Sequence, residues 1–249
     1  AGSPMSLRRA SFATMGTVAS LAAPRGDIDV MATIVEAVLW DVERRFSPYR
    51  ADSELSRLQR DPALGARLSP DMREVLTACH DLQQRTDGAF QPYDRSGRVE
   101  TTGYVKGWAM ARAGRELSSR GYRDWNLTVG GDVVVAGRNG DRPWHVAIRH
   151  PALAGGVAEV VEVSDAAVAT SGDYERGHHI WGRHEQARGG SVTVIGPSID
   201  VADALATALW AVGDHDPAWL RHFPDYGVLR LDPDGARCVV SRELAAAPR

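Results

Sequence analysis

The chain has few cysteines and no long apolar run, and these absences exclude several classes of protein. Its 249 residues include two cysteines, Cys79 and Cys238, which lie far apart and form no C-x-x-C pattern. A disulfide framework is therefore not expected, and both thiols are predicted to be free or buried. No run of about 18 apolar residues occurs, so no transmembrane helix is expected. We therefore expect a cytoplasmic protein with no membrane segment.

An excess of positive charge is also missing. The formal net charge is −3 at pH 7, so a nucleic-acid partner is not expected. Hydrophobic residues make up 43% and charged residues 24% of the chain, as in soluble globular proteins. The length is that of one large domain or two small ones, and it suffices for a core without disulfide or metal staples.

Three common catalytic and nucleotide-binding motifs are absent as well. The sequence contains no G-x-x-x-x-G-K-[ST] segment, which argues against a P-loop. No G-x-G-x-x-G follows a predicted strand, so a Rossmann dinucleotide site is not expected. No G-x-S-x-G elbow is present either, which argues against an α/β-hydrolase.

The first residues do not contribute to the predicted fold. Residues 1–4 look like a cloning remnant, and Met5 looks like the natural start. The stretch from Arg8-Arg9 to Pro24 has some features of a secretory signal. Polar residues interrupt its Ala-rich part, however, so no continuous apolar region forms. We therefore expect a first strand here, over residues 11–21.

Apolar periodicity predicts the remaining elements and the class of the fold. Helices are expected over residues 27–45, from Ser69-Pro70 onward, over 106–120 and over 201–212. Strands are expected over residues 127–136, 144–148, 157–163 and 191–195, with a closing hairpin of 226–231 and 237–240. Residues 88–103 and 177–190 are expected to be loops. Strands and helices do not alternate regularly, so we predict an α+β fold with mixed or antiparallel sheets.

The strongest local signal lies in the helix predicted over residues 201–212. Asp203 and Thr207 are four residues apart and share one face of a helix that is otherwise almost entirely apolar. A carboxylate in such surroundings is costly unless it is paired or binds a metal. A Mg²⁺ site explains both oxygens. Alternatively, Asp203 faces water and Thr207 bonds the carbonyl four residues back.

Two other segments have features of an anion-binding site. Lys106-Gly107 is predicted to open a helix, where backbone N–H groups favour an anion. Gly130-Gly131 precedes Asp132 within a predicted strand. Paired glycines there indicate close approach of a ligand or another backbone, and a simple strand kink explains them equally well.

Small hydroxyl residues and histidines follow the next apolar strand. The segment from Ala169 to Tyr174 includes Ser171 and suits a phosphate or flavin edge, although a plain turn also explains it. The pair His178-His179 lies beside Arg176 and Arg183. An imidazole here is able to assist phosphoryl transfer, whereas a solvent-exposed histidine pair is the simpler interpretation.

Taken in order along the chain, these segments resemble the ApbE family. The resemblance covers most of the chain, from near the start to about residue 213. The motifs that carry it are Met15-Gly-Thr17, Phe46-Ser-Pro-Tyr49, Asp52 to Leu58, Gly88-Ala-Phe90, Gly103 to Trp108, Gly130-Gly-Asp132, Thr170 to Tyr174, His178-His-Ile180, residues 191–195 and Ala202 to Thr207. The resemblance implies one domain over residues 5–249 with an ApbE-like, T-fold-like architecture.

The same resemblance implies an FAD:protein FMN transferase. Members of this family use Mg²⁺ to cleave FAD, release AMP and join FMN to a Thr or Ser of a target protein. The metal ligands implied are Asp203, Thr207 and the carbonyl of Val105, and the histidine implicated in transfer is His179. The residues implied to bind FAD are Met15, Tyr49, Ala89, Phe90, Gln91, Thr102, Lys106, Trp108, Gly131, Asp132, Ser171 and Trp181.

Five positions depart from the family pattern. Gln91 and Glu100 stand where the family has Asp, and Thr128 stands where it has Asn. Gly182 and Arg183 replace an Asp-Pro pair beside the expected histidine. Two alternatives to transfer therefore stay open. One is hydrolysis of FAD to FMN and AMP by the same site, and the other is FAD binding without catalysis.

Overall fold

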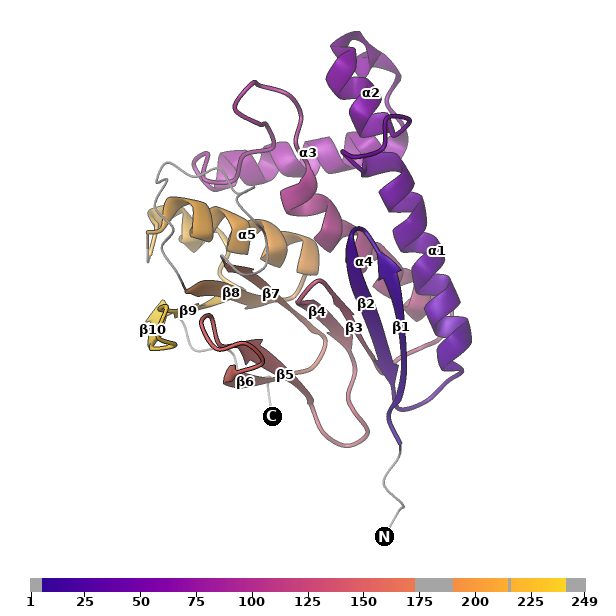
Figure 1. Cartoon of the computed structure of the whole chain (residues 1–249), viewed down its shortest axis with the longest axis vertical. Coiled ribbons are helices and arrows are strands. Elements are labelled where there is room, and N and C mark those ends of the chain that lie inside the picture. The colour runs from indigo at the N-terminus through magenta and orange to yellow at the C-terminus, as the bar shows by residue number, and fades with distance from the viewer. Residues whose placement is uncertain (1–5, 173–189, 215, 241–249) are drawn as a thin grey trace.

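An eight-stranded sheet forms the centre of the protein (Figure 1). The computed structural model describes residues 6–172, 190–214 and 216–240, with side chains as far as residue 237. The strand order is β1-β2-β3-β4-β7-β8-β9-β10, and every neighbouring pair is antiparallel. These strands are β1 (Arg8–Thr14), β2 (Thr17–Ala23), β3 (Trp125–Val129), β4 (Asp132–Ala136), β7 (Ala166–Gly172), β8 (Ser191–Gly196), β9 (Gly227–Leu231) and β10 (Arg237–Val240). The prediction of an α+β fold is confirmed.

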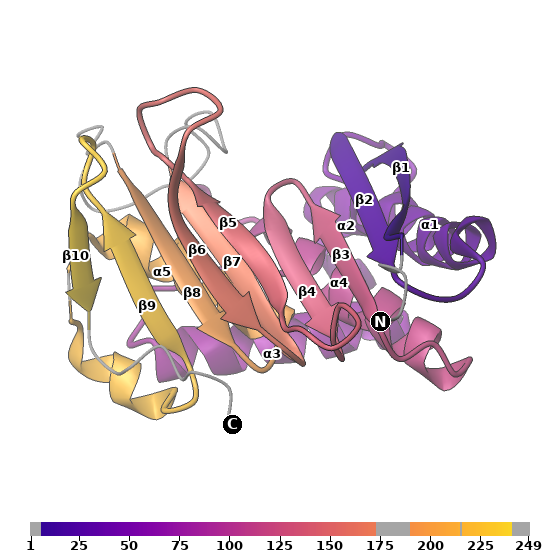
Figure 2. The ribbon, with the colours of Figure 1, turned by 90° about the horizontal axis from the view of Figure 1, so that it is seen from below.

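Helices cover one face of this sheet, and a separate hairpin covers part of the other. Figure 2 shows the helices behind the sheet and the hairpin in front of β7 and β8. The hairpin consists of β5 (Trp144–Arg149) and β6 (Val157–Val163). The α-helices are α1 (Ile28–Phe46), α2 (Glu54–Arg60), α3 (Pro70–Arg85), α4 (Thr102–Ser119) and α5 (Ile199–Val212). Two 3₁₀ helices, η1 (Pro62–Arg67) and η2 (Ala218–His222), complete the described elements. Within the described ranges, no helix is long and apolar enough to cross a membrane.

The alternation of side chains along the central strands produces two hydrophobic cores. Ala167 and Ala169 of β7 point to the helices, whereas Val168 between them packs against the hairpin. The larger core lies between the sheet and the helices. The smaller one lies under the hairpin and includes Trp144, Val146 and other side chains. The sheet is thus covered on both faces over β7.

Two of the predicted helix starts, at Asp27 and Ser69, are confirmed by their caps. The carboxylate of Asp27 accepts hydrogen bonds from the first turn of α1, and the hydroxyl of Ser69 accepts one from Met72 in α3. Pro70 occupies the first turn of α3, where its missing N–H costs nothing. Cys79 on the inner face of α3 is fully buried and free, as predicted, and burial raises the pKa of its thiol to about 12.

Two segments that were each predicted as one strand are hairpins instead. Residues 11–21 turn at Met15 and Gly16, whose φ angles are 48° and 72°. Residues 127–136 turn at Gly130 and Gly131, with φ angles of 55° and 95°. Two successive residues with positive φ form the tight turn that joins antiparallel strands. The glycine pair is therefore a turn and not a kink within a strand.

The helix predicted over residues 106–120 begins four residues earlier, at Thr102. Lys106-Gly107 consequently lies inside α4 and does not open it, so the expectation of an anion at free backbone N–H groups beside Lys106 is wrong. Thr101 takes the cap position without a side-chain hydrogen bond. The short helix α2 was not predicted at all, because its 7 residues span too few turns for a clear apolar period.

Candidate functional site at the crossing of two helices

The site is built where α4 crosses the first turn of α5. A Cβ atom on Gly107 would lie 2.6 Å from the Cα of Asp200 and 2.7 Å from the carbonyl oxygen of Ile199. Only a residue without a side chain permits this approach. One turn earlier, a Cβ on Gly103 would lie 3.3 Å from Phe90 and 3.5 Å from the methyl group of Thr207. Two glycines four residues apart therefore bring α4 against α5.

Hydrogen bonds around Asp200 hold this crossing in place. The hydroxyl of Tyr104 on α4 donates to Asp200 Oδ2 at 3.0 Å. The other oxygen of Asp200 accepts from the hydroxyl of Ser198 and from the N–H of Val201. Burial, together with the carboxylate of Asp200, raises the pKa of the Tyr104 hydroxyl. Tyr104 therefore keeps its proton and stays a donor at physiological pH.

Lys106 lies between two buried carboxylates at this crossing. Its Nζ forms an ion pair with Asp132 Oδ2 and lies 3.8 Å from Asp203 Oδ1. The side chains of Asp132 and Asp203 are 0% and 1% exposed, whereas that of Lys106 is 16% exposed. Buried carboxylates are tolerated when a cation and hydrogen bonds compensate for their lost hydration. The ammonium group of Lys106 thus links the carboxylate on β4 with the carboxylate on α5.

Asp132 also connects the site to the neighbouring strands. Its Oδ1 accepts a hydrogen bond of 3.1 Å from the backbone N–H of Thr170 in β7. The hydroxyl of Thr170 lies 2.9 Å from that of Thr193 in β8, and both residues are buried. Asp132 follows the Gly130-Gly131 turn directly, so the turn delivers the carboxylate to the helix face of the sheet.

Two of the residues expected to bind a metal, Asp203 and Thr207, lie one helical turn apart in α5. Asp203 is fully buried, and one helical turn on, Thr207 Oγ1 is buried with no hydrogen-bond partner among the described residues. Val105, the residue before Lys106, is also buried. The described ranges contain no cluster of three His, Cys, Asp or Glu side chains suited to a metal. A carboxylate, a hydroxyl without a partner and a nearby carbonyl are hard oxygen donors, so these residues fit Mg²⁺ better than zinc.

Of the residues expected to bind FAD, Phe90 contacts this crossing, and Ala89, Gln91 and Met15 lie in turns of the chain. Phe90 is buried against Gly103, and Ala89 precedes it. Gln91 is exposed. Its side-chain amide donates to the carbonyl of Gly88 and accepts from the side chain of Gln83, so it stabilises the turn over residues 88–91. Met15 lies at the β1–β2 turn.

The remaining expected residues are distributed differently. Tyr49 follows α1 and is 88% exposed, while Thr102 is exposed at the start of α4. Trp108 is buried on another face of α4, where its indole N–H donates to Glu74 and its ring packs edge-on against Phe46. The structure therefore does not bring Trp108 into the cluster of Lys106.

Two expected residues, His179 and Trp181, lie outside the described part of the chain, as does Gly182. Gly131 precedes Asp132 directly, and Ser171 follows Thr170, whose N–H donates to Asp132.

Sequence reasoning missed some polar groups of this region. The hydroxyls of Thr101, Ser171 and Ser191 are buried with no hydrogen-bond partner among the described residues. Of these, only Ser171 was predicted to take part in binding. Thr101 precedes the first turn of α4, and a hydroxyl residue just before a predicted helix is a signal that would have singled it out.

The fold and the site together define a class of protein. It is an α+β protein whose buried Lys–Asp cluster and adjacent hard oxygen donors suit an anionic ligand bound with a divalent cation. The model of the ApbE family matches residues 15–95 and 93–229 of the chain. The chain belongs to the ApbE family.

Relatives in several bacteria carry the name FAD:protein FMN transferase. The protein from Vibrio cholerae is 30% identical over 250 residues, which span 76% of this chain and 75% of that relative. The one from Haemophilus influenzae is 25% identical over 72% of each chain. A match to the Rhodobacter capsulatus protein is 37% identical, and it spans 56% of this chain and 29% of that relative.

Solved structures show the same fold. The flavin transferase ApbE from Vibrio cholerae superimposes with a TM-score of 0.76 at 24% identity, over 95% of this chain and 98% of that one. The ApbE protein from Thermotoga maritima gives a TM-score of 0.79 at 20% identity, over 96% and 100% of the two chains.

Proposed function

We propose that this chain transfers FMN from FAD to a Thr or Ser hydroxyl of a target protein, with Mg²⁺ bound at Asp203 and Thr207. Transfer of FMN from FAD to protein is the activity that its relatives in the family are named for. The observation that carries the proposal is the buried cluster of Lys106, Asp132 and Asp203 beside the unpartnered hydroxyl of Thr207.

Each residue of the cluster has a defined part in this proposal. When bound, Mg²⁺ neutralises charge that develops on a pyrophosphate during cleavage. Asp203 and Thr207, with the carbonyl of Val105, would hold it. Lys106 supplies a fixed positive charge for a phosphate oxygen, because its Nζ is held by Asp132 and cannot swing away. Phosphoryl transfer needs little more from a protein than such positioning and charge neutralisation.

One incubation separates transfer from its two alternatives. The protein is mixed with FAD, Mg²⁺ and an extract of the cells it comes from, and AMP and in-gel flavin fluorescence are measured. AMP together with a fluorescent protein band is the expected result. AMP with free FMN and no band would show an FAD hydrolase, and no AMP would show a binding protein without catalysis. NAD in place of FAD is expected to give neither product, because no dinucleotide-binding fingerprint is present.

A further prediction concerns the turn that carries Met15. Met15 has a φ of 48°, which costs a residue with a side chain about 1–3 kcal/mol. Its N–H donates to Glu43 Oε2 on α1 at 2.9 Å, which holds the turn against the helix that leads to Tyr49. We expect Met15→Asn to raise the melting temperature, because Asn tolerates this conformation, and to weaken FAD binding.

Variants of Glu43 provide the matched comparison. Glu43→Ala removes the acceptor and is expected to weaken FAD binding, whereas Glu43→Gln keeps an acceptor oxygen and should bind like the parent. Calorimetric titration with FAD and thermal unfolding measure both effects. If Met15→Asn binds FAD as tightly as the parent, Met15 does not line the flavin site.

A further inference from the structure

The face of the sheet away from the helices carries a cavity that is lined by the sheet and by β5. Its volume is about 510 Å³. Its floor consists of outward-facing side chains of β2, β3, β4 and β7, and its wall is the strand β5 with the turn before it. We refer to it as the outer groove, and its lining includes Ser20, Asn126, Thr128, Thr170 and residues 142–149.

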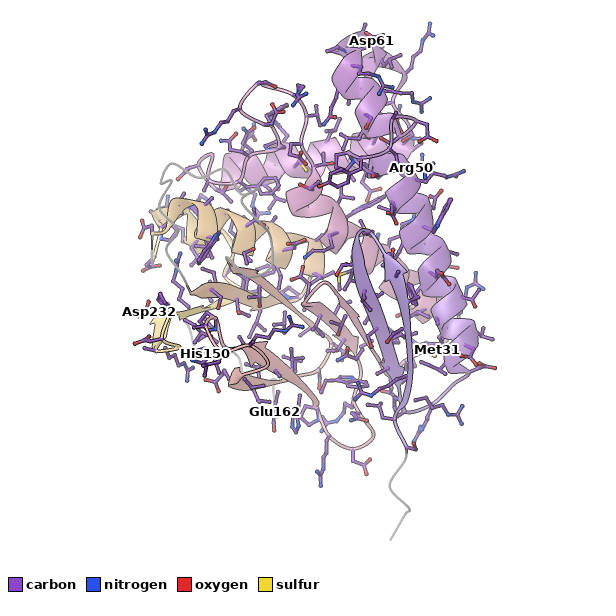
Figure 3. All side chains as sticks on the ribbon, viewed as in Figure 1. Met31, Arg50, Asp61, His150, Glu162 and Asp232 are labelled. Carbon is purple, nitrogen blue, oxygen red and sulfur yellow. The ribbon has the colours of Figure 1, made fainter. Side chains whose placement is uncertain are left out.

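The hairpin that forms one wall of the outer groove is anchored to the sheet at both ends. At one end of β5, the indole N–H of Trp144 donates to the carbonyl of Ala136 at the end of β4. At the other end, His150 Nε2 lies 3.2 Å from the carbonyl oxygen of Asp234, in the turn between β9 and β10. In Figure 3, Glu162 and His150 mark the two ends of the hairpin, and Asp232 marks the turn beside His150. On the outer face of β2 and β3, Ser20, Asn126 and Thr128 are only half-buried beside β5, whereas Val133 and Val135 of β4 are buried under the hairpin.

One edge of β5 has no strand partner among the described residues. β5 pairs with β6 alone, in a two-stranded sheet. In an antiparallel pair, every second residue of an edge strand directs its N–H and C=O away from its partner. All residues of β5 line the outer groove, so this open edge faces the space beside it. An extended peptide that enters the groove is able to pair with β5 as a third strand.

The charges around the outer groove select the kind of peptide. Arg9, Arg142 and Arg149 contribute to its lining, and no Asp or Glu does so within the described ranges. The chain as a whole is slightly acidic, so this is a local reversal of charge. The floor carries hydroxyl and amide groups, which can form hydrogen bonds with the backbone of a bound peptide. An extended segment that carries Asp or Glu side chains complements both features.

One end of the outer groove adjoins the catalytic site. Gly131 and Thr170 line the groove, and Asp132 follows Gly131 directly. Asp132 accepts the N–H of Thr170 with one oxygen and pairs with Lys106 through the other. The groove and the Lys106 cluster thus meet at the Gly130-Gly131 turn, against which the side chain of Thr17 packs, and a peptide in the groove would reach the cluster past this turn.

We infer that the outer groove binds an extended acidic segment of the target protein by pairing with β5, and so guides the acceptor toward the flavin site. The inference rests on the proposed transfer function for its biological meaning. Binding of the peptide itself does not depend on catalysis, so the two can fail separately.

The test measures peptide binding without FAD. The probe is a fluorescein-labelled peptide of about the length of β5, with Asp alternating with Val and Thr, and its counterpart has Lys in place of Asp. Fluorescence anisotropy is expected to show salt-dependent binding of the acidic peptide only. The double variant Arg142→Glu/Arg149→Glu should weaken this binding by about tenfold or more.

A matched variant and an FAD titration complete the test. Arg25→Glu/Arg115→Glu makes the same change in net charge at two exposed arginines outside the groove, and it should bind the peptide like the parent. FAD affinity, measured by calorimetry, should be unchanged in both double variants. Equal loss of peptide binding in both, or no binding by the parent, would overturn the inference. A selective loss of FAD affinity in the groove variant would also overturn it, by assigning the groove to the adenosine half of FAD.

Discussion

Replacing Asp203 by Ala is expected to lower Mg²⁺-dependent release of AMP at least about a thousandfold, which corresponds to about 4 kcal/mol of transition-state stabilisation. Asp203 is the one carboxylate on the buried face of α5 that meets the unpartnered hydroxyl of Thr207. Without it, the cation loses its charged ligand. Lys106 keeps its ion pair with Asp132, so the protein should remain folded.

The measurement combines turnover with metal binding. AMP release is followed against Mg²⁺ concentration, and Mg²⁺ binding is measured by calorimetry in the presence of FAD. Thr207→Val keeps the shape and deletes the hydroxyl, so it should show a smaller loss, and Thr207→Ser should stay near the parent. Asp214→Ala, at an exposed carboxylate after the same helix, serves as the control. A folded Asp203→Ala protein with the parent's Mg²⁺ dependence would remove the metal site from this crossing.

The second large effect is expected at Gly107, where a single methyl group should separate two helices. In Gly107→Ala, the new Cβ would lie 2.6 Å from backbone of α5, closer than side chains approach in folded proteins. Neither neighbour is a flexible side-chain end, so the helices must move. Overpacking of this kind costs about 1–3 kcal/mol. For a chain of this size, we expect the melting temperature to fall by roughly 5–10 °C.

Activity should fall in Gly107→Ala more than stability alone explains. Lys106 and Asp203 face each other across this crossing at 3.8 Å, so a shift of α5 changes the geometry that positions phosphate and cation. Gly65→Ala is the matched control, because a Cβ there meets nothing within 4 Å. Thermal unfolding and AMP release are measured for both variants at a temperature where both are folded. If Gly107→Ala melts and turns over like Gly65→Ala, α4 and α5 do not make this close contact.

The long amphipathic helices and the closing hairpin of β9 and β10 were predictable from sequence, whereas the β1–β2 and β3–β4 turns were not. The inner face of α1 repeats apolar residues at helical spacing, and a capping residue marks the start of each of α1 and α3. The β1–β2 turn was hidden because Met15 is not a usual turn residue, and both flanking strands continue the same alternation. A local pattern does not reveal a residue that is held in the left-handed region by Glu43, 28 positions away.

The cluster itself was only partly predictable. Asp203 and Thr207 stood out because burying polar groups in an otherwise apolar helix costs free energy unless they are paired or bind a ligand. The partnership of Lys106 with Asp132 depends on how α4 packs over the turn before β4, which no spacing in the sequence encodes. The same holds for the outer groove, whose shape results from the anchoring of the hairpin at both ends.

The connection between β4 and β7 has a consequence for how such proteins diverge. These two strands pair directly, although the hairpin of β5 and β6 lies between them in the chain. The hydrogen bonds between β4 and β7 therefore do not depend on the length or sequence of the β5–β6 hairpin. Substitutions and insertions there leave strand register and the helix-side core intact. Changes in the β5–β6 hairpin are therefore expected to alter the outer groove while the Lys106 cluster on the opposite face keeps its geometry.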